Sequence, residues 1–398
     1  MEITFNCTCR MQQRCSSGQD FAAGRCDPAS LPLEYGREFD SLSPLPGSYY
    51  RIALLVPLCG AAGIWSPSCI ASAQVAVKEL NRRDGIDGRQ VQLLLVDAAE
   101  EAAVPVDSLV CDLLAAQAID AIVGMHISAV RQRLSKVVRQ RVPFIYTPLY
   151  EGGERTPGVV AIGETPALQL GPAIGHLHAT YRFRRWAMIG NDYVWPRASH
   201  TFAKRILRDC STPLVYERYL PFGVSDMGPF VDEIRRCRAD AVLVSLIGQD
   251  AVMFNRAFGE ADLHRSTVRF SCAVEENVLL ASGPKSLNRF YASAAYFGSL
   301  RTEANASFRE KYHSIHGDHA PVLNTLGQST YEGIHCLAAL VDTHGDDWRS
   351  RAADFAARGH YQSARRMTRG TTEPRPLPVY LARVTGMEFE IVKNLTRQ

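Results

Sequence analysis

The stretch "AVKELNRRDGIDGRQVQLLLVDA", residues 76–98, joins two segments with different hydrophobic periods. Residues 67–83 carry apolar side chains at helical spacing, whereas residues 91–98 form the continuous Leu- and Val-rich run of a buried strand. An earlier run of the same kind, "RIALLVPL", occupies residues 51–58. Two buried strands joined by a helix predict the first βαβ unit of a parallel sheet.

The same alternation continues in two series. In the first, strands are expected at 120–125, 143–147 and 159–163, with helices at 103–117 and 128–140. In the second, strands are expected at 185–190, 213–222, 240–248 and 268–273, with helices at 196–209, 226–237 and 249–262. Two α/β series predict two lobes, each a doubly wound, mostly parallel sheet flanked by helices, with its ligand surface at the carboxyl ends of the strands.

The remaining chain predicts crossovers between the lobes. Helices are expected at 303–315 and 324–342, followed by a strand pair, "PVYLARVT" and "EFEIV". We expect the first lobe to comprise residues 49–166 and about 295–340. The second lobe would comprise residues 167–294 and about 341–398.

Composition limits the class of protein. With 398 residues, 46% hydrophobic and 21% charged, the chain can form two ordinary cores. The net charge is +3 and the signs are interleaved, which predicts no surface suited to direct nucleic-acid binding. No run approaches the roughly 18 apolar residues of a membrane span, and the first 48 residues lack the apolar core of a secretory signal. A cytoplasmic location is therefore expected, and several cysteines beside hydrophobic segments agree with a reducing compartment.

Residues 1–48 are rich in Ser, Gly and Pro, which predicts a flexible extension. The extension contains Cys7, Cys9, Cys15 and Cys26, but their spacing matches no standard paired metal site. We therefore expect no metal there.

The sequence lacks the common catalytic motifs. The chain contains no G-x-S-x-G, no G-x-x-x-x-G-K-[ST], no H-E-x-x-H, and no G-x-G-x-x-G after its first strand. An enzyme is unsupported, and no catalytic residue and no cofactor are expected.

Two segments at expected strand ends concentrate aromatic residues. They are "FIYTPLYEGGERTP" at 144–157 and "IGNDYVWPRASH" at 189–200. Tyr146, Tyr150, Tyr193 and Trp195 could wall a small pocket, and the alternative is packing between the lobes. In "MHISAVRQ" at 125–132, Ser128 is expected as a helix N-cap that meets a carbonyl or carboxylate, or as a plain cap.

These segments carry a resemblance to a known family. Residues 76–98 resemble the signature of type I periplasmic-binding-protein folds of the branched-chain amino acid class. "YTPLYEG" at 146–152 and "GNDYVWPR" at 190–197 look like its amide and urea branch, which is typified by cytoplasmic amide sensors of amidase operons and includes their nitrile-pathway relatives. The resemblance covers about residues 50–395.

The resemblance implies a two-lobed clamshell that closes on a small amide. Ser128 would hydrogen-bond the ligand, Tyr146, Thr147 and Pro148 would line the first-lobe wall, and Tyr193 would close over it. Tyr150 and Trp195 would support these residues, whereas Glu151 and Gly152 look like turn-formers.

The chain departs from its relatives at two places. His126 stands where relatives often have an aromatic residue. In the second lobe, Ala273, Val274 and Glu275 stand where hydroxyl residues are expected. This wall would be less polar, which favours an amide larger or more apolar than acetamide.

The resemblance implies a cytoplasmic regulator of amide- or nitrile-utilisation genes, whose partner is an RNA-binding antiterminator. The alternative is the solute-binding component of an ABC importer for urea, short amides or branched-chain amino acids. Cell fractionation separates the two. A homo-oligomer is compatible with the sequence.

Overall fold

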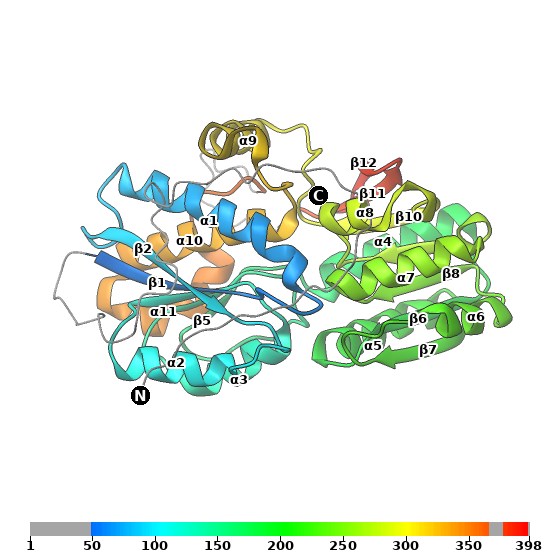
Figure 1. Cartoon of the computed structure of the whole chain (residues 1–398), viewed down its shortest axis with the longest axis horizontal. Coiled ribbons are helices and arrows are strands. Elements are labelled where there is room, and N and C mark those ends of the chain that lie inside the picture. The colour runs from blue at the N-terminus through cyan, green and yellow to red at the C-terminus, as the bar shows by residue number, and fades with distance from the viewer. Residues whose placement is uncertain (1–48, 366–376, 397–398) are drawn as a thin grey trace, which may run out of the picture.

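The computed structural model describes residues 49–365 and 377–396. Two sheets of mostly parallel strands, each flanked by helices, form two lobes that lie side by side (Figure 1). This confirms the predicted fold class of two lobes, each a mostly parallel sheet flanked by helices. The predictions for residues 1–48 lie outside the described ranges.

The first lobe is built on a parallel sheet in the order β2-β1-β3-β4-β5. Its strands are β1 (Tyr49–Val56), β2 (Gln90–Asp97), β3 (Ala121–Gly124), β4 (Phe144–Tyr146) and β5 (Val159–Ala161). The helices in this part of the chain are η3 (Gly63–Trp65), α1 (Ser66–Asn81), α2 (Val106–Ala115) and α3 (Ser128–Val138). Strand β1 pairs with β2 on one side and β3 on the other, so its apolar run is buried.

Asn81 and Gly85 determine the connection between α1 and β2, within residues 76–98. Asn81, the last residue of α1, accepts a hydrogen bond from the Val91 amide at 2.7 Å and donates one to the Val91 carbonyl at 2.9 Å. Gly85 has a positive φ of 73°, and a Cβ there would lie 1.8 Å from the Arg89 carbonyl oxygen. The tight turn therefore needs glycine, and the asparagine fixes the start of β2 against the helix.

Three later helices return to the first lobe. They are α9 (Glu303–His316), α10 (Thr325–His344) and α11 (Trp348–Arg358). Helix α10 packs along α1 and contacts β3 and β4, and α11 packs against β5 and α10. The sequence predicts residues after about 341 in the second lobe, but α11 packs on the first lobe, where Trp348, Ala352 and Phe355 are buried. The boundary therefore lies after α11.

The second lobe is built on a sheet of seven described strands in the order β12-β11-β10-β9-β8-β6-β7. Its strands are β6 (Trp186–Asn191), β7 (Leu214–Leu220), β8 (Ala241–Ser245), β9 (Val268–Ser271), β10 (Phe290–Ala294), β11 (Tyr380–Thr385) and β12 (Glu388–Asn394). Among these described strands, β11 alone has the reversed direction: it pairs antiparallel with both β10 and β12. Its helices are α4 (Pro166–Tyr181), α5 (Val194–Asp209), α6 (Gly228–Arg236), α7 (Gly248–Glu260) and α8 (Glu276–Ser282).

Four single-turn 3-10 helices complete the connections: η4 (Leu263–Arg265), η5 (Pro284–Ser286), η6 (Gly317–His319) and η7 (Gly345–Asp347). Within the described ranges, no helix combines the length and the apolar character needed to cross a membrane.

Candidate functional site

A cavity lies where the carboxyl ends of the strands of both lobes meet. It is lined by Trp65, His126, Ile127, Ser128, Tyr146, Pro148, Leu149, Tyr193, Trp195, Ile247, Cys272, Ala273, Glu275, Thr325 and Leu326. The space without atoms is about 400 Å³, open solvent included, but the centre of a water molecule can occupy only about 20 Å³ of it. A ligand larger than about one or two waters therefore enters only when the walls move.

The lobes touch each other beside the cavity. The Gln249 amide at the start of α7 donates a hydrogen bond to the Ala61 carbonyl at 2.8 Å. The Asn277 side chain at the start of α8 donates one to the Ile64 carbonyl at 3.0 Å. Both bonds join the second lobe to the loop after β1, so the two lobes are in contact at this edge of the cavity.

Ser128 lies in the first-lobe wall, but not as the expected N-cap. It is the first residue of α3, and the cap position belongs to Ile127, which makes no side-chain capping bond. The helix begins at Ser128, the first residue of its predicted range, and Ile127 in extended backbone takes the cap position. The Ser128 hydroxyl is therefore not used to cap the helix, and it lies 3.4 Å from the Tyr146 hydroxyl.

Tyr146 and His126 form a neutral polar pair next to Ser128. The Tyr146 hydroxyl donates to the His126 carbonyl at 2.8 Å, and burial raises the pKa of the phenol. Burial lowers the pKa of His126 to about 3, so its ring is uncharged at neutral pH. Its Nδ1 lies 3.2 Å from the Ile127 carbonyl, which assigns the proton to Nδ1. The buried Nε2, which has no hydrogen-bond partner among the described residues, is then an acceptor.

The rest of the first-lobe segment divides into cavity wall and support. Pro148 lines the cavity, whereas Thr147 and Tyr150 are not among the lining residues. The Thr147 hydroxyl donates to the Gly124 carbonyl at 3.2 Å and so secures the end of β4 to β3. Tyr150 packs edge to face on Tyr146, with ring centroids 6.3 Å apart.

Two aromatic residues from the second lobe close the opposite wall. Tyr193 immediately precedes α5, and Trp195 is the second residue of that helix. Their rings lie 6.3 Å apart, and Tyr193 also contacts Phe222 at 5.6 Å. Burial raises the pKa of Tyr193 well above its usual range, so its hydroxyl stays protonated. Trp195 and Trp65 each carry a buried indole N–H with no partner among the described residues.

Glu275 adds a polar group to the wall that was expected to be less polar. Its Oε2 accepts from the Asn277 amide at 2.6 Å and from the Asn324 side chain at 3.3 Å. Its Oε1 is buried without a partner among the described residues. Burial, followed by the charge of Glu276, raises the pKa of Glu275 to about 8. At neutral pH the carboxyl is therefore mostly protonated and can donate or accept a hydrogen bond.

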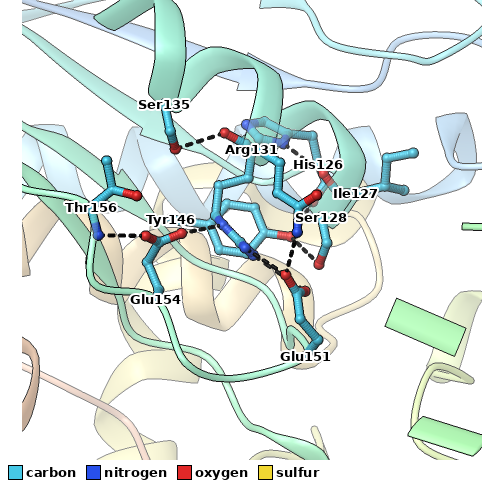
Figure 2. A network of polar contacts seen from close by, with 10 residues as sticks. His126, Ile127, Ser128, Arg131, Ser135, Tyr146, Glu151, Glu154 and Thr156 are labelled. Carbon is cyan, nitrogen blue, oxygen red and sulfur yellow. Dashed lines mark hydrogen bonds and ion pairs between the residues drawn. The ribbon is translucent and has the colours of Figure 1, made fainter. Parts of the chain in front are cut away.

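Behind the first-lobe wall, Arg131 is held by two glutamates (Figure 2). Its side chain is 3% exposed and lies 2.6 Å from Glu151 and 2.7 Å from Glu154. The guanidinium also lies over the ring of Tyr146, 4.9 Å from its centroid. Glu151 was expected only as a turn-former, but it is an ion-pair partner. Gly152, with a φ of +90°, lies at a bend in this loop.

Sequence reasoning missed several lining residues. Ile247 and Cys272 follow β8 and β9, so the strand-end rule could have found them. Trp65 belongs to the loop region after β1, and its position depends on η3. Thr325 and Leu326 begin α10, which reaches the cavity from a distant part of the chain, and no local pattern marks them.

The arrangement suits binding of an uncharged molecule. Among the described residues that line the cavity there is no Lys or Arg, and the ring of His126 is neutral. The walls offer indole N–H groups, hydroxyls and one carboxyl between aromatic and aliphatic surfaces. A closed site of this composition can recognise a small solute through matched hydrogen bonds and apolar contact.

Comparison with known proteins identifies the family. A family model described as periplasmic binding protein matches residues 50–386. The chain belongs to this family. It is a family of ligand-binding proteins, which confirms the prediction that the chain binds and is not an enzyme.

Solved structures of solute-binding proteins have the same fold. A solute-binding protein of an ABC transporter from R. palustris, in complex with benzoate, is 17% identical, with a TM-score of 0.73 and coverage of 88% of this chain and 97% of that chain. The branched-chain amino acid transporter substrate-binding protein from Streptococcus pneumoniae, in complex with isoleucine, is 14% identical, with a TM-score of 0.72 and coverage of 87% and 99%. A leucine-binding protein from Thermotoga maritima is 14% identical, with a TM-score of 0.69 and coverage of 86% and 98%. At these identities the likeness shows the fold, and closeness to the amide sensors stays a prediction.

Proposed function

We propose that this protein is the solute-binding component of an ABC importer for a small, largely apolar solute that carries an amide or a similar neutral polar group. The observation that carries the proposal is the aromatic-lined cavity between the two lobes. The similar proteins from R. palustris and S. pneumoniae are transporter components by their descriptions, which favours an importer over a regulator.

The apolar part of the solute is inferred from the walls. Trp65, Tyr146, Tyr193 and Trp195 present ring surface from both lobes, and Ile247, Leu149 and Leu326 add aliphatic surface. Burial of apolar area contributes about 25 cal/mol per Å², and aromatic pairs add about 0.5–1.5 kcal/mol. Acetamide and urea have too little apolar area to use these walls, so a larger solute is favoured.

The polar part of the solute is inferred from the unsatisfied groups. An amide oxygen can accept from Ser128 or an indole N–H, and an amide N–H can donate to Glu275 Oε1. A carboxylate would lose its hydration without meeting a cationic side chain in the described wall, which is costly. A neutral amide satisfies more of these groups than an acid does.

Binding is tested by thermal shift and titration calorimetry on the full chain. The panel consists of benzamide, benzylamine, benzoate, leucine, acetamide and urea. A ligand of the folded state raises the melting temperature, so benzamide is expected to give a larger, saturable rise than acetamide or urea. If no member of the panel raises it, or if urea gives the largest rise, the proposed ligand class is wrong.

The regulator hypothesis, with a cytoplasmic location and an RNA-binding antiterminator as partner, stays a prediction. An importer component must act outside the cytoplasmic membrane, so the two hypotheses differ in location. Fractionation of the native host, followed by immunoblotting, separates them. Recovery outside the cytoplasm, with loss of labelled-solute uptake on gene deletion, supports the importer. Recovery in the cytoplasm together with an RNA-binding protein supports the regulator.

A further inference from the structure

Arg131 is the charged side chain on the first turn of α3, directly behind Ser128. Its positive charge is paired with two carboxylates of the same chain, Glu151 and Glu154. Its Nη2 lies 2.6 Å from Glu151 Oε1 and its Nη1 lies 3.4 Å from Glu151 Oε2, so Glu151 occupies the terminal nitrogens of the guanidinium. Its Nε donates to Glu154 at 2.7 Å. One cation with two carboxylates leaves this cluster with a net negative charge.

The carboxylate of Glu151 lies where several hydrogen-bond donors meet, and the carboxylate of a solute could accept from the same donors. The Gln132 side chain also donates to Glu151 Oε1 at 2.9 Å, so α3 directs two donor side chains at it. Burial raises the pKa of Glu151, but hydrogen bonds from Arg131 and, more weakly, Ser128 lower it overall. Ser128 lines the cavity, so the Glu151 carboxylate lies next to the cavity wall as well as to the guanidinium. An acidic solute would have to compete with it for the same donors.

We propose that Glu151 is a specificity-determining residue: it occupies Arg131 and thereby makes the site reject carboxylate-bearing solutes in favour of the matching amides. This inference rests on the proposed function, because it concerns the ligand choice of the same cavity. Glu151 is not among the residues that line the cavity. It affects selectivity indirectly, because its ion pair keeps Arg131 from binding the carboxylate of a solute.

Glu154 provides a matched control. It forms an ion pair with the same guanidinium at nearly the same distance, and it lies on the opposite side of Arg131 from Glu151 (Figure 2). Its other oxygen accepts from the Thr156 amide at 2.8 Å, within its own loop. Glu151→Gln and Glu154→Gln therefore remove the same charge from the same cation, but only the first frees the nitrogens on the Ser128 side.

The test compares acid and amide pairs by titration calorimetry at pH 7 on the full chain. The probes are benzoate with benzamide, and leucine with leucinamide. The wild type is expected to prefer the amide. Glu151→Gln is expected to lower the amide-to-acid affinity ratio by about tenfold or more, because the freed guanidinium nitrogens then donate charge-assisted hydrogen bonds that favour a carboxylate. Glu154→Gln is expected to leave the ratio near the wild-type value.

The outcomes are distinct. Equal shifts in both variants, or no shift in Glu151→Gln, would overturn the inference while the binding function stands. Failure of every probe to bind all three proteins would overturn the proposed ligand class, and the inference with it. Circular dichroism melting checks the fold. If Glu151→Gln does not fold, Glu151→Asp, which withdraws the carboxylate by one methylene, must shift the ratio in the same direction or the inference fails.

Discussion

At the scale of single residues, burial makes the titratable groups of the cavity neutral. It lowers the pKa of His126 to about 3 and raises the pKa of Tyr146 and Tyr193. Each group therefore keeps a fixed donor or acceptor role across the physiological pH range. Among the described residues that line the cavity, Glu275, with a pKa of about 8, is the group that titrates near neutral pH. The hydrogen-bond pattern offered to a solute depends on pH mainly through this residue.

Ser128 and Tyr193 are the residues from which we expect direct ligand contact. Removing the hydroxyl in Ser128→Ala, or the ring in Tyr193→Ala, is expected to weaken solute binding by about 1–3 kcal/mol with little change in folding. Calorimetry with the best ligand of the panel measures this. Ser135→Ala on the same helix is the control, because its hydroxyl bonds to the Arg131 carbonyl. Equal affinities in all three variants and the wild type would place the site elsewhere.

Glu275 predicts a pH dependence of stability. Its folded pKa of about 8 exceeds the unfolded value of about 4.3, so between these values the folded state holds a proton that the unfolded chain has lost. Stability from this group is present below about pH 4.3 and is lost as pH rises through about 8. Glu275→Gln has no such loss, so its stability relative to the wild type should rise between pH 5.5 and 9, by about 1 kcal/mol or more.

Urea unfolding at several pH values measures the Glu275 effect. Glu260→Gln, at an exposed position at the end of α7, is the control. A constant difference between Glu275→Gln and the wild type across this pH range would show that Glu275 is not held protonated.

At the scale of elements, periodicity located the long buried strands and the amphipathic helices but not every short element. Strand β10 has the sequence "FYASA", in which small residues replace the usual Leu and Val run, so it was missed. It is a strand because β9 and β11 flank it. Helix α8 has seven residues, too few for a helical period to show. Tertiary pairing decided both elements.

Gly248, the first residue of α7, allows the two lobes to approach each other closely. Gly248 has a φ of +46°, and a Cβ there would lie 2.0 Å from the Ala61 carbonyl oxygen of the other lobe. Gly248→Ala is therefore expected to hold the lobes apart and to weaken binding by about tenfold or more, because the closed state becomes less populated. Small-angle scattering of the ligand-saturated protein should give a larger radius of gyration than the wild type.

Gly223→Ala controls for backbone strain in the Gly248 experiment. Gly223 also has a positive φ, of 75°, in the same lobe, but a Cβ there would meet nothing within 4 Å. If Gly223→Ala weakens binding as much as Gly248→Ala does, strain and not the interlobe contact is responsible.

At the scale of the whole molecule, the site could be predicted where strand ends determine it. The two aromatic segments follow β4 and β6, and the parallel-sheet rule brings their residues to one cavity. The contribution of Leu326 depends on the return of α10 from a distant part of the chain. The cluster of Arg131, Glu151 and Glu154 forms because the loop after β4 brings two carboxylates to the buried guanidinium. Such contacts are properties of the folded chain, and no local pattern encodes them.

The three crossovers between the lobes meet at Glu164, which connects β5 to α4. Its Oε1 accepts from the Ala295 amide of the second crossover at 2.7 Å, and its Oε2 lies 3.8 Å from Arg365 of the third. Arg365 also forms an ion pair with Glu332 of α10 at 2.6 Å, and neither side chain of that pair is exposed. These three crossovers form the hinge, and a buried ion network joins them. Loss of the Arg365 cation would leave two carboxylates, Glu164 and Glu332, in the interior.

Arg365→Met is expected to destabilise the protein by about 3–5 kcal/mol, because breaking a buried ion pair from one side leaves uncompensated charge. Urea unfolding followed by tryptophan fluorescence measures this loss, since Trp65 reports on the first lobe and Trp186 on the second. Arg383→Met is the control: its ion pair with Glu390 is of similar length, 2.7 Å, but both side chains are half exposed, so little change is expected. If the two variants unfold at the same urea concentration, the hinge network does not stabilise the fold, and the crossovers are held by apolar packing alone.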